Sequence, residues 1–119
     1  MATFSKNILS SSTDGKGIKV AQTATAGTLI HTGPTVTSSF DEVWLYAVNS
    51  SASDVKLTIE WGEATAPDGN IEYTVKAENG LYLIVPGLLI KGNATALTVR
   101  AFAATTNVIL VHGYVNKIV

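Results

Sequence analysis

Few residues of this chain could act as acids, bases, nucleophiles or metal ligands, and they are scattered. The sequence holds two histidines and no cysteine. His31 lies in a short expected strand, and His112 lies on the same strand face as Leu110 and Tyr114. A metal site needs a second and a third ligand at strand spacing, and none is near in the sequence. We therefore expect each histidine to be held by packing and one hydrogen bond, with no metal ion or cofactor.

Carboxylates occur close together at two places. Glu60 and Glu63 flank one tryptophan-glycine pair, and Asp41 and Glu42 are neighbours. Paired carboxylates can catalyse glycoside hydrolysis or bind calcium. Glu60, however, alternates with the apolar positions of its strand and shares an outward face with Lys56. We therefore expect these acids to be solvated, in turns and on strand faces.

The sequence contains no motif for a nucleophile or for phosphate binding. No serine lies in a G-x-S-x-G context. The glycines are isolated rather than arranged as a phosphate-binding loop. These features favour a protein that is not an enzyme.

Charge and hydropathy argue against two further classes of partner. The net charge of −1 and the isoelectric point near 6.0 provide no basic field for nucleic acid. The longest apolar run, Leu81 to Ile90, is interrupted by Pro86-Gly87 and is too short to span a bilayer. Residues 1–6 do not begin a secretory signal peptide. We expect a protein made in a cytoplasm that binds neither nucleic acid nor membrane.

The stretch 41–61 organises the expected fold. Residues 55–61 alternate apolar and polar side chains, as a strand with one buried face does. Residues 43–48 are apolar on both faces, so both faces should be covered. The small polar residues 49–54 between them are typical of a turn. We interpret this stretch as a hairpin, and we expect a second hairpin at Asn79-Gly80, before a buried strand over 81–85.

The whole chain predicts an all-β fold. About eight strands separated by turns every 8 to 12 residues indicate an antiparallel β-sandwich. A jelly roll fits this count and the long connections, and the sequence does not separate it from another Greek-key sandwich. We expect one domain over 17–119. Residues 1–16 resemble an extended N-terminal arm that is either frayed or tied down on a neighbouring molecule.

Aromatic and apolar residues supply the candidates for interaction. Trp44, Tyr46 and Val48 share the second face of the central strand, where they serve as core, subunit interface or ligand platform. The only large apolar side chains of the arm are Phe4, Ile8 and Leu9. The low charged fraction of 14% permits such surfaces to meet other subunits without charge repulsion.

Six segments carry a resemblance that covers nearly the whole chain. They are residues 12–20 (STDGKGIKV), 25–32 (TAGTLIHT), 42–49 (EVWLYAVN), 57–62 (LTIEWG), 85–89 (VPGLL) and 113–118 (GYVNKI). With these segments the chain resembles small virion proteins of tailed bacteriophages, of the kind encoded beside the major capsid protein.

The resemblance implies a structural function. It implies a capsid decoration (cement) protein on the surface of the virion, with the major capsid protein as its partner and no catalytic or cofactor residues. Such proteins in general assemble as trimers or dimers, so we expect a homotrimer or a homodimer whose residues 1–16 reach onto capsid protein. The alternative is a β-sandwich module of a head fibre, tail fibre or baseplate that binds host glycans or a receptor.

Overall fold

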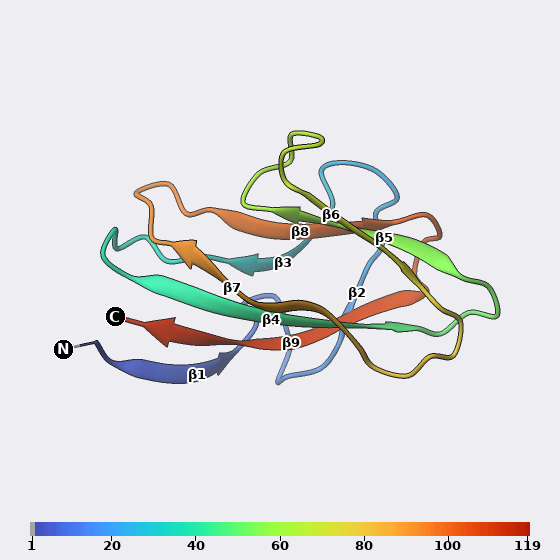
Figure 1. The fold of residues 1–119 in the computed structure, drawn as a ribbon, viewed down its shortest axis with the longest axis horizontal. Coiled ribbons are helices and arrows are strands. Elements are labelled where there is room, and N and C mark those ends of the chain that lie inside the picture. Colours follow the sequence, from blue (N-terminus) through green and yellow to red (C-terminus); the bar gives the residue numbers. More distant parts are fainter. Residues whose placement is uncertain (1) are drawn as a thin grey trace.

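The computed structural model describes residues 2–119, which form two antiparallel sheets that face each other (Figure 1). Within these residues the strands are β1 (Phe4–Ile8), β2 (Ile18–Lys19), β3 (Thr28–Thr32), β4 (Phe40–Asn49), β5 (Val55–Trp61), β6 (Asn70–Val75), β7 (Tyr82–Lys91), β8 (Thr98–Ala103) and β9 (Ile109–Ile118). No described segment forms a helix long and apolar enough to cross a membrane. The all-β prediction is confirmed.

The strand order is that of a jelly roll. One sheet has the order β1-β9-β4-β7, with β2 also paired to β9, and the other has the order β3-β8-β5-β6. From β2 onward the chain passes from one sheet to the other at every connection except β5 to β6. A jelly roll is such a two-sheet sandwich of Greek-key connections.

The expected hairpin over 41–61 is wrong. Its two strands, β4 and β5, lie in different sheets, where β4 pairs with β7 and β9 while β5 pairs with β6 and β8. Asn49 fixes the crossing, because its side-chain amide donates to the carbonyls of Ser53 at 2.8 Å and Val75 at 2.9 Å. The polar turn therefore brings two apolar strand faces together across the sandwich rather than side by side in one sheet.

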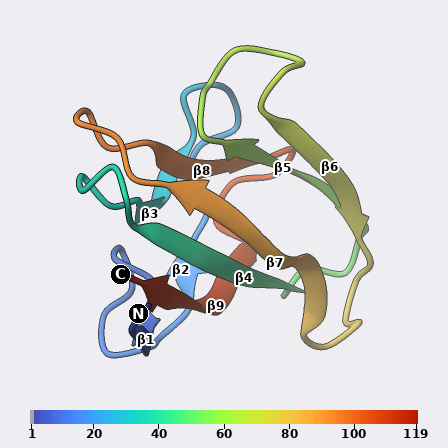
Figure 2. The same cartoon turned by 60° about the vertical axis from the view of Figure 1, so that its left-hand side comes forward.

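The expected hairpin at Asn79-Gly80 is also wrong, and β7 is not a buried strand. The turn connects β6 of one sheet to β7 of the other. β7 lies beside β4 at the edge of its sheet (Figure 2), and its ladder is irregular on both sides of Pro86. An edge is where a strand tolerates proline, which has no N–H to donate. Four apolar side chains of β7 are exposed: Tyr82, Leu83, Leu88 and Leu89.

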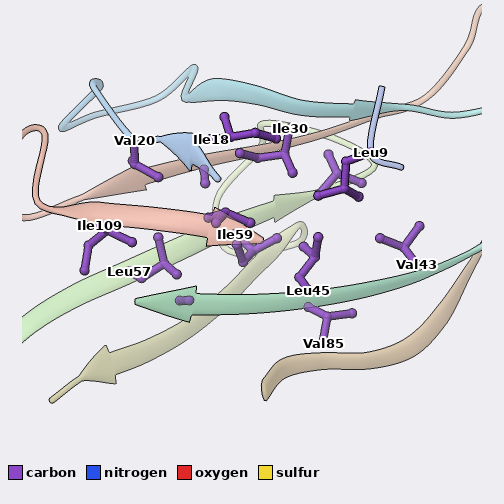
Figure 3. Close-up of a cluster of buried hydrophobic side chains, with 14 of the residues drawn as sticks. Leu9, Ile18, Val20, Ile30, Val43, Leu45, Leu57, Ile59, Val85 and Ile109 are labelled. Carbon is purple, nitrogen blue, oxygen red and sulfur yellow. The ribbon is translucent and has the colours of Figure 1, made fainter. Parts of the chain in front are cut away.

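The core lies between the two sheets, where inward side chains of both meet (Figure 3). Val43 and Leu45 of β4 and Val85 of β7 come from one sheet, and Leu57 and Ile59 of β5 come from the other. All five are almost completely buried. Side chains alternate along each strand, so these inward positions determine which residues face outward.

The N-terminal segment is part of the fold rather than a free arm. β1 pairs with β9 of the same chain, from Phe4 opposite Ile118 to Ile8 opposite Tyr114. Leu9, which follows β1, is only 1% exposed and belongs to the core. The next residue, Ser10, accepts a hydrogen bond from the backbone N–H of Thr32 in the other sheet at 2.7 Å. The segment therefore joins the two sheets.

Leu9 and Ile8 give a matched test of this placement. Leu9→Ala should lower the free energy of unfolding by about 2–4 kcal/mol, because it leaves a cavity in the core. Ile8→Ala removes a side chain that is 49% exposed and should change it by less than about 0.5 kcal/mol. Urea unfolding measures both values. Equal, small effects of the two variants would contradict the packing of Leu9.

Candidate interaction face

The outward side of β4 and β9 carries mostly large apolar and aromatic side chains. β4 alternates between buried residues and residues that are partly exposed. The partly exposed set includes Trp44, Tyr46 and Val48, which pair with Tyr114, His112 and Leu110 of β9. Residues opposite each other in a ladder point to the same side of the sheet. The two strands therefore present one continuous surface, which we call the outer face.

β1 extends the outer face with its apolar residues. Phe4 and Ile8 pair with outward residues of β9, and both are well exposed, at 68% and 49%. The polar side chains of Ser5 and Asn7 point to the opposite side of the sheet, toward the second sheet. A solvated edge strand would place its polar side chains outward. With Phe4 and Ile8 outward on either side of Lys6, β1 adds exposed apolar surface to the outer face.

Trp44 lies at the centre of the outer face and is held there by three contacts. Its ring stacks on Tyr114 with centroids 6.0 Å apart and planes 11° apart. Its Nε1 donates to Oε1 of Glu42 at 2.9 Å. The indole also covers Gly87, where an added Cβ would lie 2.9 Å from the ring and where φ is +78°. The fold thus fixes the orientation of Trp44 without burying it.

The outer face carries few charges. The carboxylate of Glu42 accepts hydrogen bonds from Trp44 and from Asn116, at 2.7 Å, and these bonds lower the pKa of Glu42. The ammonium of Lys6 lies 4.8 Å from the centroid of the Tyr114 ring, within cation–π range. One acid and one base thus lie near Trp44, while Lys19, opposite Leu110, and Lys91, opposite Phe40, take the same side at the margins of the outer face.

The structure gathers five of the six interaction candidates on the outer face. Phe4 and Ile8 come from β1, and Trp44, Tyr46 and Val48 come from β4. Leu9 does not belong to it, because it is buried in the core. The sequence prediction missed the contribution of β9, although the shared face of Leu110, His112 and Tyr114 was a signal for it.

His31 is a buried structural histidine with two hydrogen bonds, one more than expected. Its Nδ1 accepts from the backbone N–H of Ser10 at 3.0 Å, so the neutral ring carries its proton on Nε2. Nε2 donates to Oδ2 of Asp41 at 2.7 Å. Asp41 was expected in solvent but is buried, and its Oδ2 also lies 3.3 Å from Nζ of Lys117. The hydrogen bonds of His31 with Ser10 and Asp41 thus link the N-terminal segment and β3 to β4.

Glu60 was also expected in solvent, and it is only 2% exposed. Its carboxylate accepts a hydrogen bond from the backbone N–H of Gly27 at 2.7 Å and another from the hydroxyl of Thr25. Arg100 donates to the carbonyl of Gly27 at 3.0 Å. Glu60 therefore anchors the loop before β3, and its partners explain how a carboxylate is buried at this position.

The described residues present no enclosed chemical site. Within residues 2–119 no group of three or more histidines and acids is placed to hold a metal ion. The same residues enclose no pocket. The outer face is thus the strongest candidate for a functional site in this part of the chain.

Comparisons with known proteins give no relative: no family model, no curated protein and no solved structure matches this chain.

His31 predicts a pH dependence of stability. Burial lowers its pKa below the ordinary value of 6.5, against the opposing effect of Asp41. As the pH falls, the histidine of the unfolded chain therefore takes up a proton at a higher pH than His31 of the folded chain. The free energy of unfolding should decrease below about pH 6.5, by at most about 1.4 kcal/mol per pH unit. Urea unfolding between pH 7.5 and 5.5 should show this loss in the wild type and in His112→Gln. The loss should be absent in His31→Gln, and an unchanged slope in that variant would contradict the assignment.

Proposed function

We propose that this chain is a non-enzymatic structural protein of a virion, most specifically a capsid decoration protein that self-associates and binds the lattice of the major capsid protein. The observation that carries the proposal is the outer face. A row of apolar and aromatic side chains, including Phe4, Ile8, Trp44 and Tyr46, stays open on an otherwise complete sandwich. Contiguous apolar surface of this kind marks an interaction site on a soluble domain.

Two further features support a lattice subunit. The jelly roll occurs in viral capsid domains, although a fold by itself does not define a function. The net charge of −1 lets many copies pack closely on a shell without strong mutual repulsion. Both features agree with the resemblance to small virion proteins of tailed bacteriophages.

β7 offers a surface for attachment to the shell. One side of this strand pairs with β4, while its other backbone edge has no partner strand within residues 2–119. Leu88 and Leu89 are exposed beside that edge, at 43% and 54%. An open edge flanked by apolar side chains can accept a strand or an apolar segment of another protein. Binding only to the assembled shell would stabilise that state by mass action.

The N-terminal segment has a different role from the one expected for it. Residues 4–8 pair with β9, and Leu9 is buried in the core. A segment so placed does not reach across to a neighbouring capsid protein. It contributes Phe4 and Ile8 to the outer face instead.

Co-sedimentation tests the attachment to the shell. The purified chain should sediment with shells assembled from the major capsid protein of the same genome and saturate at a fixed ratio. Leu88→Ser/Leu89→Ser should weaken this binding at least about tenfold, since it removes two apolar contacts. The control Val36→Ser, at a loop position that is 60% exposed, should bind like the wild type. Failure of the wild type to sediment with shells would contradict the proposed function.

A glycan-binding module is the second candidate, because one cluster on the outer face resembles a sugar platform. The rings of Trp44 and Tyr114 lie beside the carboxylate of Glu42 and the amide of Asn116. Aromatic rings next to a few polar groups are typical of small-ligand sites. Specific binding to a glycan array, lost in Trp44→Ala and accompanied by no affinity for shells, would favour this candidate over the first.

A further inference from the structure

The outer face is organised in rows that run across β1, β9 and β4. Because β1 and β4 both pair with β9, each row holds one outward residue from each of the three strands. The three rows are Phe4–Ile118–Phe40, Lys6–Asn116–Glu42 and Ile8–Tyr114–Trp44. In every row the central residue comes from β9; the flanking residues are two phenylalanines in the first row, opposite charges in the second, and an aliphatic and an aromatic side chain in the third.

A two-fold axis parallel to β9 would make this face complementary to itself. If two copies are stacked face to face about such an axis, β9 lies over the β9 of the second copy, and β1 lies over its β4. Each residue then keeps its height along the strand, so every row faces the same row of the other copy. Stacked sheets keep their strands within about 30° of each other and lie about 10 Å apart, which this arrangement satisfies.

The resulting contacts match in chemistry. Lys6 of each copy faces Glu42 of the other, which gives two symmetric pairs of opposite charge. Phe4 faces Phe40, and the aliphatic Ile8 faces the ring of Trp44. Lys6 is exposed, so its long side chain can leave Tyr114 and extend to the second copy. An axis perpendicular to the strands would instead place β1 over β1 and bring like charges together.

We propose that the occupant of the outer face is a second copy of this chain, stacked about a two-fold axis along β9. The inference rests on the proposed function, since it assigns the self-association expected of a decoration protein to one surface. It also selects the homodimer over the homotrimer, because a two-fold interface uses the same patch on both copies and closes with two. The contact spans three short rows of side chains, and small interfaces are typical of weak complexes, so the dimer should dissociate on dilution.

The same geometry leaves the shell-binding edge free. β7 is the next strand beyond β4, and no strand of the second copy lies opposite it, because the sheet ends at β1 on that side. The exposed Leu88 and Leu89 therefore remain accessible on both flanks of the dimer. One dimer could thus bind the lattice at two places, which raises its avidity without a new contact.

Cysteine cross-linking tests the axis directly, because the chain has no cysteine of its own. Lys6→Cys and Glu42→Cys are mixed without any capsid protein and treated with a bis-maleimide whose spacer is about 10 Å, the distance between stacked sheets. Cross-linked heterodimers should exceed the homodimers of either variant at least about fivefold. The pair Phe4→Cys and Phe40→Cys repeats the test at a second row. The control Thr74→Cys, an exposed position on β6 of the other sheet, should remain uncross-linked.

Three cross-linking results would contradict the two-fold axis along β9. Homodimers of Lys6→Cys in excess would indicate the perpendicular axis, cross-linked trimers would indicate another interface, and no cross-link at either pair would leave the face without a second copy. Each of these overturns the inference. Co-sedimentation with shells tests the proposed function separately, because a chain that does not form this dimer still carries Leu88 and Leu89 of β7.

Exchanging the charges of Lys6 and Glu42 provides a second test of the same interface. Lys6→Glu places two like charges across the interface and should raise the dissociation constant of the dimer about tenfold or more. Adding Glu42→Lys restores opposite charges and should recover at least half of the lost binding free energy. An equally weak double variant would overturn the pairing of Lys6 with Glu42.

Discussion

The ladder between β4 and β9 is the constraint on which the rest of the structure depends. Ten residues pair in unbroken register, from Phe40 opposite Ile118 to Asn49 opposite Ile109. Because side chains alternate, the inward placement of Val43 and its neighbours obliges the next residues to face outward. A slip by one residue would put the large aromatic side chains inside and leave the core exposed. The core and the outer face are thus two results of a single register.

The N-terminal segment connects this ladder to the second sheet. β1 adds a strand to β9, and Leu9 then enters the core. The backbone N–H of Ser10 completes the hydrogen bonding of His31, whose other nitrogen binds Asp41 of β4. A buried polar group is tolerated only when its partners are present, so folding of the sandwich includes this segment. The outer face acquires the side chains of β1 as a consequence.

The alternation of apolar residues predicted the strands and the sandwich, but not how the strands pair. Residues 49–54 have the composition of a turn, and composition does not distinguish a turn within one sheet from a crossing between two sheets. The burial of Glu60 was not predictable either, because its partner Gly27 is 33 residues away in the sequence. The two apolar sides of 43–48 were predicted. Only the structure separates the core side from the side that carries Trp44.

If the outer face is an interface between two copies, the molar mass of the unmodified chain provides its most direct test. Sedimentation equilibrium over a wide concentration range should follow a reversible transition from the 12.5 kDa chain to a particle of twice that mass. The transition should shift to higher concentration when Trp44 is replaced by serine. A mass that stays at 12.5 kDa up to near-millimolar concentration, or one that rises to three times that value, would contradict the two-fold dimer.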